Sequence, residues 1–449
     1  MAHPYIPNIH LEKHMLEKAG IDKKSLFSDI PDNLRLRDEL KIPEPRSEIE
    51  TYRYIKQILK KNKSDLLCFM GGGSYPVYVP AHVKHIIQRS EFYTSYTSYQ
   101  AEVSQGMLQA LFEFQSMIAE LYGMDCANAS MYDGATALAE AILMAMRITK
   151  KKKIILPYIM HWDMKSVIYN YTEGAGGIID YVDLDEKGLF NLDELLEKID
   201  KNTAAVCVQN PSFVGTFQTH IKELAEISHD SDAKLIVYSD PVALGITKSP
   251  GELGADIAVG DGQSLGIPMW YGGPTVGIFT FKYNKKDIRQ APGRFVGMTV
   301  DKDGQRRFTL TLQAREQAIR RASATSNICS NEALCALNAA VYLASVGPEG
   351  LKKIAEISMK NAHYLMRKLN SLPTVFAPHY NGYHFREFTA EFQGQDLDTV
   401  IKGLIEHGIL PGIKLDKLVL NRILLIATTE LHSKEDLDRF IDAVGDIIE

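Results

Sequence analysis

A cluster of small and polar residues stands at the predicted start of a helix in the first third of the chain. Residues 128–137 read NASMYDGATA, and the apolar residues after them recur at helical spacing. Free N–H groups at a helix start attract anions, so Gly134, Ala135 and Thr136 could hold a phosphate or a carboxylate. The alternative is that Asp133 caps this helix and that no ligand binds there.

Two further polar residues follow predicted strands. Asp240 comes after the apolar run 235–238, and His161 comes shortly after the run 154–156. Open α/β sheets bind ligands at the carboxyl ends of their strands, where a carboxylate such as Asp240 could pair with a pyridinium nitrogen. Asp240 could equally cap the turn at Pro241, and His161 could be a solvated or core-edge histidine.

The chain also has a loop of the kind that presents one side chain to a cleft. Residues 257–274 read IAVGDGQSLGIPMWYGGP, in which a short apolar run leads to Gln263 and Ser264 and then to a tail rich in Gly and Pro. An amide is not the amine nucleophile that Schiff-base chemistry requires. Gln263 therefore cannot hold a carbonyl cofactor covalently.

Three consecutive glycines at 71–73 form the most glycine-dense segment of the chain. They would let the backbone approach a ligand closely, but a phosphate-binding loop should open a helix. Here the sequence YPVYVP follows, which is extended. We predict a turn or an interface loop at this position.

A block of tyrosines and hydroxyl side chains precedes a long predicted helix. It includes Tyr96, Tyr99 and Gln100, and Glu102 follows directly. The block is too polar for a core strand and suits a lining of hydrogen-bond donors; an interface loop with stacked tyrosines is the other interpretation, and both can hold. Apolar spacing then predicts an amphipathic helix over 102–122, ended by Gly123.

The elements that would position these residues alternate between strand and helix. Helical patterns separate several β-branched runs, notably at 192–199 and 220–228. This alternation predicts a mostly parallel sheet covered on both faces. The predicted strands are 154–156, 178–182, 204–208, 235–238, 257–259 and 276–281.

The pattern changes after residue 320 to that of a second, α+β domain. Helices are predicted at 331–345 and 351–369, on either side of Gly347-Pro348, and at the C-terminus after a capping box of Ser433 and Asp436. Between them the pattern predicts strands at 387–392 and 422–427 and a helix at 397–406. We expect three parts, an N-terminal arm with short helices at 1–100, a large α/β domain at 101–320 and a small α+β domain at 321–449.

Composition excludes several classes of protein. The 449 residues are 45% hydrophobic and 24% charged, with a net charge of −6, so no basic surplus is present to bind nucleic acid. Five scattered cysteines without CxxC spacing fit neither a disulfide framework nor a zinc site. We see no secretory signal and no run of about 20 apolar residues that would cross a membrane, and we expect a cytoplasmic protein.

Four sequence blocks together resemble a known family. A helix-start anion site, a strand-end Asp and then a strand followed by a Gly-rich loop is the order found in pyridoxal-phosphate enzymes of the aspartate-aminotransferase fold, fold type I. More closely, SYTSYQAEVSQG, ANASMYDGATALAEA, GQSLGIP with its GGP tail, and ATSNICSNEALCAL resemble the glycine cleavage system P-protein, in the form of subunit 1 of its two-subunit version. The resemblance runs through nearly the whole chain. It implies an aspartate-aminotransferase-like α/β fold with a mostly parallel, seven-stranded-type sheet and a smaller C-terminal α+β domain.

The resemblance explains why a glutamine at position 263 matters for cofactor binding. In subunit 2 of that family the equivalent loop carries His-Lys, and Gln263 stands where the lysine would be. The resemblance therefore implies that pyridoxal phosphate is held by the partner, subunit 2, and not covalently by this chain. The complex would decarboxylate glycine and pass the aminomethyl group to the lipoyl arm of the H-protein, with T-protein and L-protein as the system's other components.

The resemblance also suggests where this chain would contribute. The polar groups of Tyr96, Tyr99, Gln100 and Glu102 could reach the partner's cleft, and the hydroxyls that start the interdomain helix could meet an anion. Family members often have His-Pro where this chain has His161-Trp162, which suggests that Trp162 partly fills a vestigial pocket. The candidates for that pocket are Gly134, Ala135, Thr136, His161, Asp240, Gln263, Ser264, Thr325 and Ser326.

Two other functions remain open at this point. A stand-alone pyridoxal-phosphate aminotransferase would need a lysine elsewhere, such as Lys248 or Lys282, and neither has the expected position in the topology. The chain could also be a purely structural or regulatory binding subunit. The sequence does not distinguish an αβ from an α2β2 assembly.

Overall fold

The computed structural model describes residues 5–36, 38, 40–418 and 420–448, in two compact units that meet in sequence at Ser64 and Asp65. The first unit contains two α-helices, and α2 begins with a capping box in which Ser47 and Glu50 satisfy each other's backbone N–H groups. None of the described residues of this unit is buried. Its elements are η1 (Ile9–Leu11), α1 (Glu12–Ala19), η2 (Ser25–Phe27) and α2 (Glu48–Leu59).

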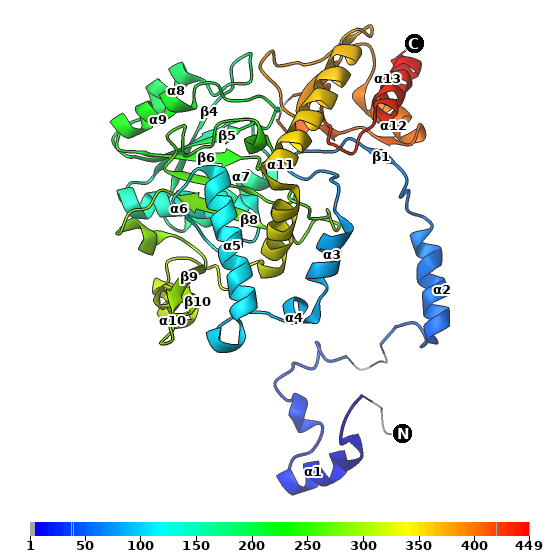
Figure 1. Ribbon diagram of the computed structural model, residues 1–449. Coiled ribbons are helices and arrows are strands. Elements are labelled where there is room, and N and C mark those ends of the chain that lie inside the picture. Colours follow the sequence, from blue (N-terminus) through cyan, green and yellow to red (C-terminus); the bar gives the residue numbers. More distant parts are fainter. Residues whose placement is uncertain (1–4, 37, 39, 419, 449) are drawn as a thin grey trace. The chain divides into compact units, whose positions relative to one another are not determined.

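The second unit is built around a seven-stranded, mostly parallel sheet (Figure 1). β3 to β7 run parallel, while β8 is antiparallel to β7, and β2 is antiparallel to β8. The predicted fold class and all six strands predicted for this sheet are confirmed, and of the strands in this sheet the two-residue β2 was not expected. The strand order is β2 (Cys126–Ala127), β8 (Gly277–Phe281), β7 (Ile257–Asp261), β6 (Lys234–Ser239), β5 (Thr203–Asn210), β3 (Lys153–Pro157) and β4 (Ile178–Val182).

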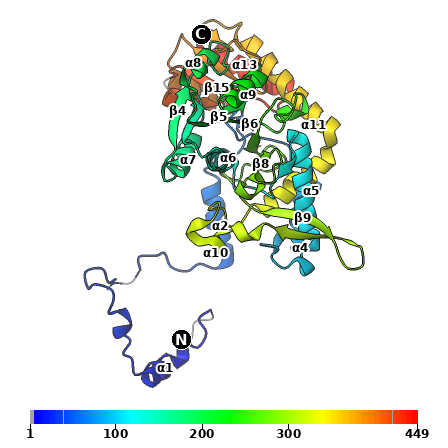
Figure 2. The same ribbon diagram turned by 90° about the vertical axis from the view of Figure 1, so that its left-hand side faces the viewer.

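Helices cover both faces of this sheet, as the apolar strands require (Figure 2). Successive side chains of β6 enter different cores, because Leu235 and Val237 join one cluster and Ile236 joins the other. The first cluster includes α5 (Gln105–Tyr122), α8 (Leu192–Lys198), α9 (Ile221–Asp230) and the start of α11 (Ala333–Leu369). The second includes α6 (Gly134–Thr149) and α7 (Trp162–Glu173).

The long helix α5 begins later than its apolar spacing predicted. Its first residue is Gln105, because the preceding turn η3 (Ala101–Val103) leaves Val103 exposed and outside the core. The predicted C-terminal end is confirmed, because Gly123 has a φ of +63° and adopts the left-handed conformation that ends the helix.

A second, four-stranded sheet forms the core of the C-terminal part. Its strands are in the order β11 (Val375–Phe376), β12 (Glu387–Phe392), β15 (Ile423–Ala427) and β14 (Ile413–Lys414), packed with α12 (Leu397–Glu406) and α13 (Lys434–Ile448). The predicted capping box of α13 is confirmed, because Ser433 and Asp436 each accept the other's backbone N–H. The short strand β1 (Leu67–Cys68) pairs with β13 (Ile409–Leu410), which brings residues 69–75 beside this sheet.

Helix α11 links the two sheets. Its two helical segments meet at Gly347, whose backbone (φ +60°, ψ −178°) is not helical, directly before Pro348, as the sequence predicted. It is the one helix among the described residues that is long and apolar enough to cross a membrane, but Leu337, Tyr342 and Leu365 are buried in the clusters. We interpret α11 as a core helix. The remaining α-helices and strands are α3 (Ala81–Ile87), α4 (Ser90–Tyr93), α10 (Gln317–Arg320) and the hairpin of β9 (Phe295–Val300) and β10 (Arg306–Thr311).

Candidate functional site

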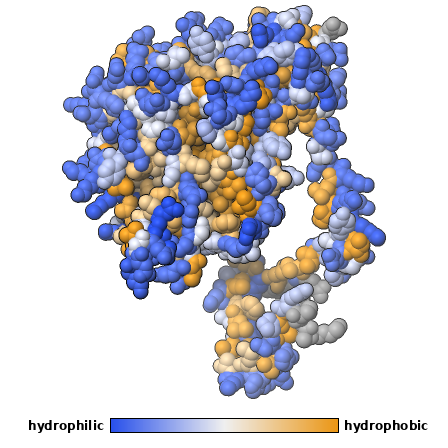
Figure 3. Space-filling model, in the orientation of Figure 1, coloured by the Kyte–Doolittle hydropathy of each residue, from blue (hydrophilic) through white to orange (hydrophobic). Residues whose placement is uncertain are grey.

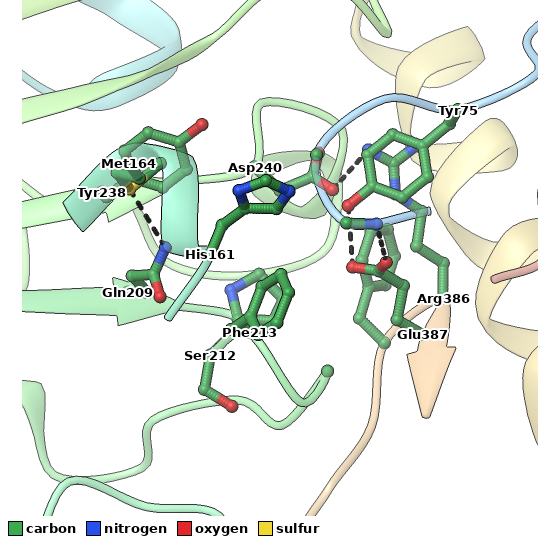
Figure 4. A pocket seen from close by; sticks show the side chains of 15 residues that line it. Tyr75, His161, Met164, Gln209, Ser212, Phe213, Tyr238, Asp240, Arg386 and Glu387 are labelled. Carbon is green, nitrogen blue, oxygen red and sulfur yellow. Dashed lines mark hydrogen bonds and ion pairs between the residues drawn. The ribbon is translucent and has the colours of Figure 1, made fainter. Parts of the chain in front are cut away.

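A small cavity lies where polar residues gather at the carboxyl ends of the central strands (Figure 4). Its volume is about 60 Å3. Gln209 comes from the end of β5, Tyr238 and Asp240 from the end of β6, and His161 from the loop after β3. The opposite wall consists of Gly72, Gly73, Tyr75, Phe385, Arg386 and Glu387.

Arg386 and Asp240 form a buried ion pair on this cavity. Arg386 Nη2 lies 2.5 Å from Asp240 Oδ2 and 3.3 Å from Ser264 Oγ, and the Arg386 side chain is only 2% exposed. The ring of Tyr75 stacks on the guanidinium, 3.5 Å from its Cζ to the ring centroid. The other oxygen of Asp240 accepts the N–H of Val242 at 2.9 Å, so this carboxylate also caps the turn after β6. Both oxygens of Asp240 are therefore engaged within the chain.

The three-glycine segment is held by Glu387. The Glu387 carboxylate accepts the N–H of Gly72 at 2.6 Å and the hydroxyl of Tyr75 at 2.7 Å. Burial raises the pKa of Glu387 above its ordinary value, and these hydrogen bonds only partly offset that effect. A Cβ atom at Gly71 would lie 2.2 Å from Glu387 Oε1, so only glycine fits there. The segment is a turn bound to the C-terminal sheet, in line with the turn that we predicted.

Gln263 joins the loop after β7 to the same segment. Its Oε1 accepts the N–H of Tyr75 at 2.9 Å, and its Nε2 donates to the carbonyl oxygens of Tyr75 at 3.0 Å and Ile267 at 2.8 Å. The side chain is 4% exposed and is not among the residues that line the cavity. A lysine has no acceptor for the Tyr75 N–H, so an amide makes a connection that a lysine could not make.

The start of α6 is occupied by two carboxylates of the chain itself. Asp133 Oδ1 accepts the N–H of Thr136 at 2.7 Å, and Asp261 Oδ2 accepts the N–H of Gly134 at 2.9 Å. Burial raises the pKa of Asp261 to about 6, although Thr275, Gly134 and Gln263 all donate hydrogen bonds to it. The cap by Asp133 that we considered is present, and Gly134, Ala135 and Thr136 do not line the cavity.

His161 lines the cavity as a neutral side chain. Its Nδ1 accepts the N–H of Asp163 at 3.1 Å, which caps α7 and fixes the ring next to Trp162 and Phe213. Burial lowers the pKa of His161. Trp162 is not among the lining residues, and Lys417 lies 4.6 Å above its ring. The space that we expected Trp162 to fill is instead narrowed by Tyr75 and Arg386, which come from distant parts of the sequence.

Thr325 and Ser326 lie in a different depression, formed with Gly293, Arg315 and Glu316. Ser326 Oγ donates to Glu140 Oε1 at 2.5 Å, and burial raises the pKa of Glu140.

The tyrosine block lies on the surface of the second unit. Tyr96 is 78% exposed and its hydroxyl lies 2.8 Å from Ser330 Oγ. Tyr99 is 56% exposed, and its hydroxyl accepts a hydrogen bond from Arg294 Nη2 at 2.8 Å. Gln100 and Glu102 are also exposed. These four residues are absent from the cavity lining and are available to a partner.

Of the predicted site residues only His161 and Asp240 line the cavity, so sequence reasoning missed most of its wall, including Gln209. Tyr75 and Glu387 are 312 residues apart, and no local pattern connects them. One weak signal was present, because Arg386 and Glu387 are two adjacent charged residues at the point where a predicted strand begins.

Comparisons with known proteins agree with this architecture. The family model described as the glycine cleavage system P-protein matches residues 3–444. The chain is 45% identical over 452 residues to a protein of Thermococcus onnurineus named probable glycine dehydrogenase (decarboxylating) subunit 1, with full coverage of both chains.

Solved structures give the same result. The crystal structure of a glycine decarboxylase (P-protein) of the glycine cleavage system, in inhibitor-bound form, matches with a TM-score of 0.88 and 40% identity over 100% of both chains. A sphingosine-1-phosphate lyase from Burkholderia pseudomallei matches with a TM-score of 0.67 at 14% identity over 94% of both chains, which concerns the fold alone. On this evidence the chain belongs to the glycine cleavage system P-protein family.

Proposed function

We propose that this chain is subunit 1 of glycine decarboxylase and that it acts only together with a second chain, subunit 2. The complex decarboxylates glycine on pyridoxal phosphate and transfers the aminomethyl group to the lipoyl arm of the H-protein. The observation that carries this proposal is the fully engaged amide of Gln263 in a chain that otherwise has the family's fold over its whole length.

The residues of this chain do not fit pyridoxal phosphate. The phosphate would meet the carboxylates of Asp133 and Asp261 at the start of α6, where both N–H groups are already paired. The position expected to face the pyridinium nitrogen is occupied by the ion pair of Asp240 with Arg386. We therefore propose that subunit 2 holds the cofactor.

This cavity also argues against a stand-alone aminotransferase. Neither Lys248 nor Lys282 is among the residues that line it, and its lining contains no lysine of any kind. A Schiff base needs a lysine amine at the site of the cofactor.

An exposed apolar surface supports a role for a partner. Figure 3 shows apolar residues gathered on the face of the second unit in the region of α5 and α11. Apolar patches of this kind mark interaction sites. In the segment before α5, Tyr93, Tyr96, Tyr99 and Val103 are also exposed. We propose that Tyr96, Tyr99, Gln100 and Glu102 lie in or next to the active site of subunit 2. The further partners are the lipoylated H-protein, T-protein and L-protein, in the cytoplasm.

Reconstitution tests the proposal. Each purified chain alone, and then their mixture, is assayed for glycine-dependent exchange of labelled carbon dioxide with pyridoxal phosphate present. We expect exchange only in the mixture and no aldimine absorbance in this chain alone. A control mixture uses subunit 2 with its Schiff-base lysine replaced by alanine, which should be inactive. Exchange or an aldimine in this chain alone would contradict the proposal.

A further inference from the structure

Two residues that line the cavity each carry a buried polar atom without a partner in the described part of the chain. Gln209 is 7% exposed, its Nε2 meets only the Met164 sulfur at 3.7 Å, and its Oε1 accepts no hydrogen bond. Figure 4 shows the amide with its nitrogen toward Met164 and its oxygen turned away from it. On the other side of the cavity, Arg386 Nε has no acceptor, although Nη2 of the same guanidinium binds Asp240.

Unpaired groups of this kind call for an explanation. Buried polar atoms are nearly always hydrogen-bonded, and a charged donor without an acceptor is especially costly. The two groups are opposite in kind, because Gln209 Oε1 only accepts and Arg386 Nε only donates. A single ligand that satisfies both must carry an N–H or O–H donor and a negatively charged or carbonyl acceptor.

The size of the cavity limits this ligand to a few atoms. Its volume of about 60 Å3 corresponds to roughly five water-sized groups at about 10–15 Å3 each. Aromatic or imidazole rings of His161, Phe213 and Tyr238 form part of the wall, so the ligand must also be flat or small enough to lie against them.

The charges favour a ligand with no net charge. Arg386 is already paired with Asp240, and the Glu387 carboxylate lies on the same wall. A phosphate would bring about two further negative charges toward these carboxylates. A cation alone would leave Arg386 Nε unpaired.

We propose that this cavity binds a small α-amino acid as its zwitterion, with the ammonium donating to Gln209 Oε1 and the carboxylate accepting from Arg386 Nε. Glycine, with five heavy atoms and no side chain, matches the size. The choice of glycine among small amino acids rests on the proposed function; the zwitterionic class rests on the cavity alone. The chain would then bind the substrate of the complex at a site on subunit 1, where no cofactor lysine is present.

Calorimetric titration of the full-length chain alone with glycine tests this site, with no subunit 2 and no cofactor present. We expect saturable one-to-one binding. Acetate and methylamine, each of which supplies only one end of the zwitterion, should bind at least tenfold more weakly. L-Phenylalanine, with the same two ends and a side chain too large for the cavity, should not bind.

Two glutamine variants separate binding from folding. Gln209→Met keeps the length of the side chain and removes an unpaired acceptor, so the chain should fold with unchanged or higher melting temperature and bind glycine at least tenfold more weakly. Gln115→Met is the matched control, because both ends of this buried amide pair with the backbone of Val296. It should lower the melting temperature and leave glycine affinity unchanged.

Three results would overturn the proposal. The first is no binding of glycine at about 50 mM, which is far above the millimolar Kd of a weak site. The others are acetate binding as tightly as glycine, and full glycine affinity in Gln209→Met. The reconstitution assay fails or succeeds independently. Glycine binding to this chain with no exchange in the mixture would refute the proposed function and leave the amino-acid site intact.

Discussion

At the scale of single residues, Gln263 has a structural role. Its amide matches both the donor and the acceptor of the Tyr75 backbone, as a neighbouring strand would. Asp240 also has a structural role, because its two oxygens bind Arg386 and the Val242 N–H. These contacts make both side chains part of the packing of the chain, so a lysine at position 263 alone should not create a cofactor site.

Replacement of Gln263 by lysine tests this interpretation. The variant leaves the Tyr75 N–H without its acceptor and puts an ammonium group in a buried position, so we expect a loss of about 2–4 kcal/mol in the free energy of unfolding. It should also gain no aldimine absorbance with pyridoxal phosphate, because Asp133 and Asp261 still occupy the start of α6. Urea unfolding and an absorbance spectrum measure both effects.

Gln57→Lys, on the exposed helix α2, is the control and should change the free energy of unfolding by no more than about 0.5 kcal/mol. A stable variant that forms an aldimine would disprove the interpretation.

At the scale of elements, the local patterns were sufficient for most of the framework. Strands β3 to β8 and helices α8, α9, α12 and α13 follow from apolar runs, helical spacing and caps, which are properties of neighbouring residues. The start of α5 was wrong by three residues, because the apolar Val103 continued the spacing although it lies in a turn. The contacts of Gln263 with Tyr75, of Asp240 with Arg386 and of Glu387 with Gly72 depend on how distant segments meet, and the sequence gives no local sign of them.

The helix α6 supplies a prediction about pH. Asp261, which caps this helix through Gly134, has its pKa raised by burial from 3.8 to about 6. A carboxyl group with a raised pKa binds its proton more tightly in the folded state, so its contribution to stability is fully present below pH 3.8 and is lost as the pH rises through 6. The shift of about two units corresponds to about 3 kcal/mol.

Comparison with Asp261→Asn isolates this effect. We expect the variant to gain stability relative to the wild-type chain as the pH rises from 4 to 6.5, by up to about 3 kcal/mol, and no further change in the difference above pH 7. Urea unfolding at a series of pH values gives the difference, in which the other titrating groups cancel. Asp303→Asn, in the exposed turn between β9 and β10, provides the matched control for the exchange of a carboxylate for an amide. A difference between Asp261→Asn and the wild-type chain that does not change with pH would contradict the raised pKa.

At the scale of the whole molecule, the chain has the fold of a cofactor enzyme, and its own cavity is too small and too occupied for the cofactor. This agrees with the proposal that the chain acts only together with subunit 2. The packing of the chain does not explain Tyr96, whose hydroxyl contacts Ser330 and which is otherwise open to solvent. The first unit, in which no described residue is buried, also leaves many apolar side chains without a core of their own.

Removal of the two tyrosine hydroxyls tests the role of this surface in the complex. In Tyr96→Phe and Tyr99→Phe the aromatic rings remain, so association with subunit 2 should be preserved. We expect each variant to lower glycine-dependent exchange about tenfold or more, because a hydrogen bond to a charged group in the partner's active site contributes about 1.5–3 kcal/mol. Tyr99→Phe also removes the acceptor of Arg294 Nη2, so the melting temperature of this variant is measured to separate lost stability from lost exchange. Tyr283→Phe is the control and should exchange at the wild-type rate. Tyr283 is 58% exposed, close to the 56% of Tyr99, and lies outside the tyrosine block. Titration of each variant with subunit 2 measures association separately from exchange. Unchanged exchange in both variants would show that the tyrosine hydroxyls do not contact the partner's active site. Lower exchange at unchanged affinity for subunit 2 places these hydroxyls among the groups that act on glycine.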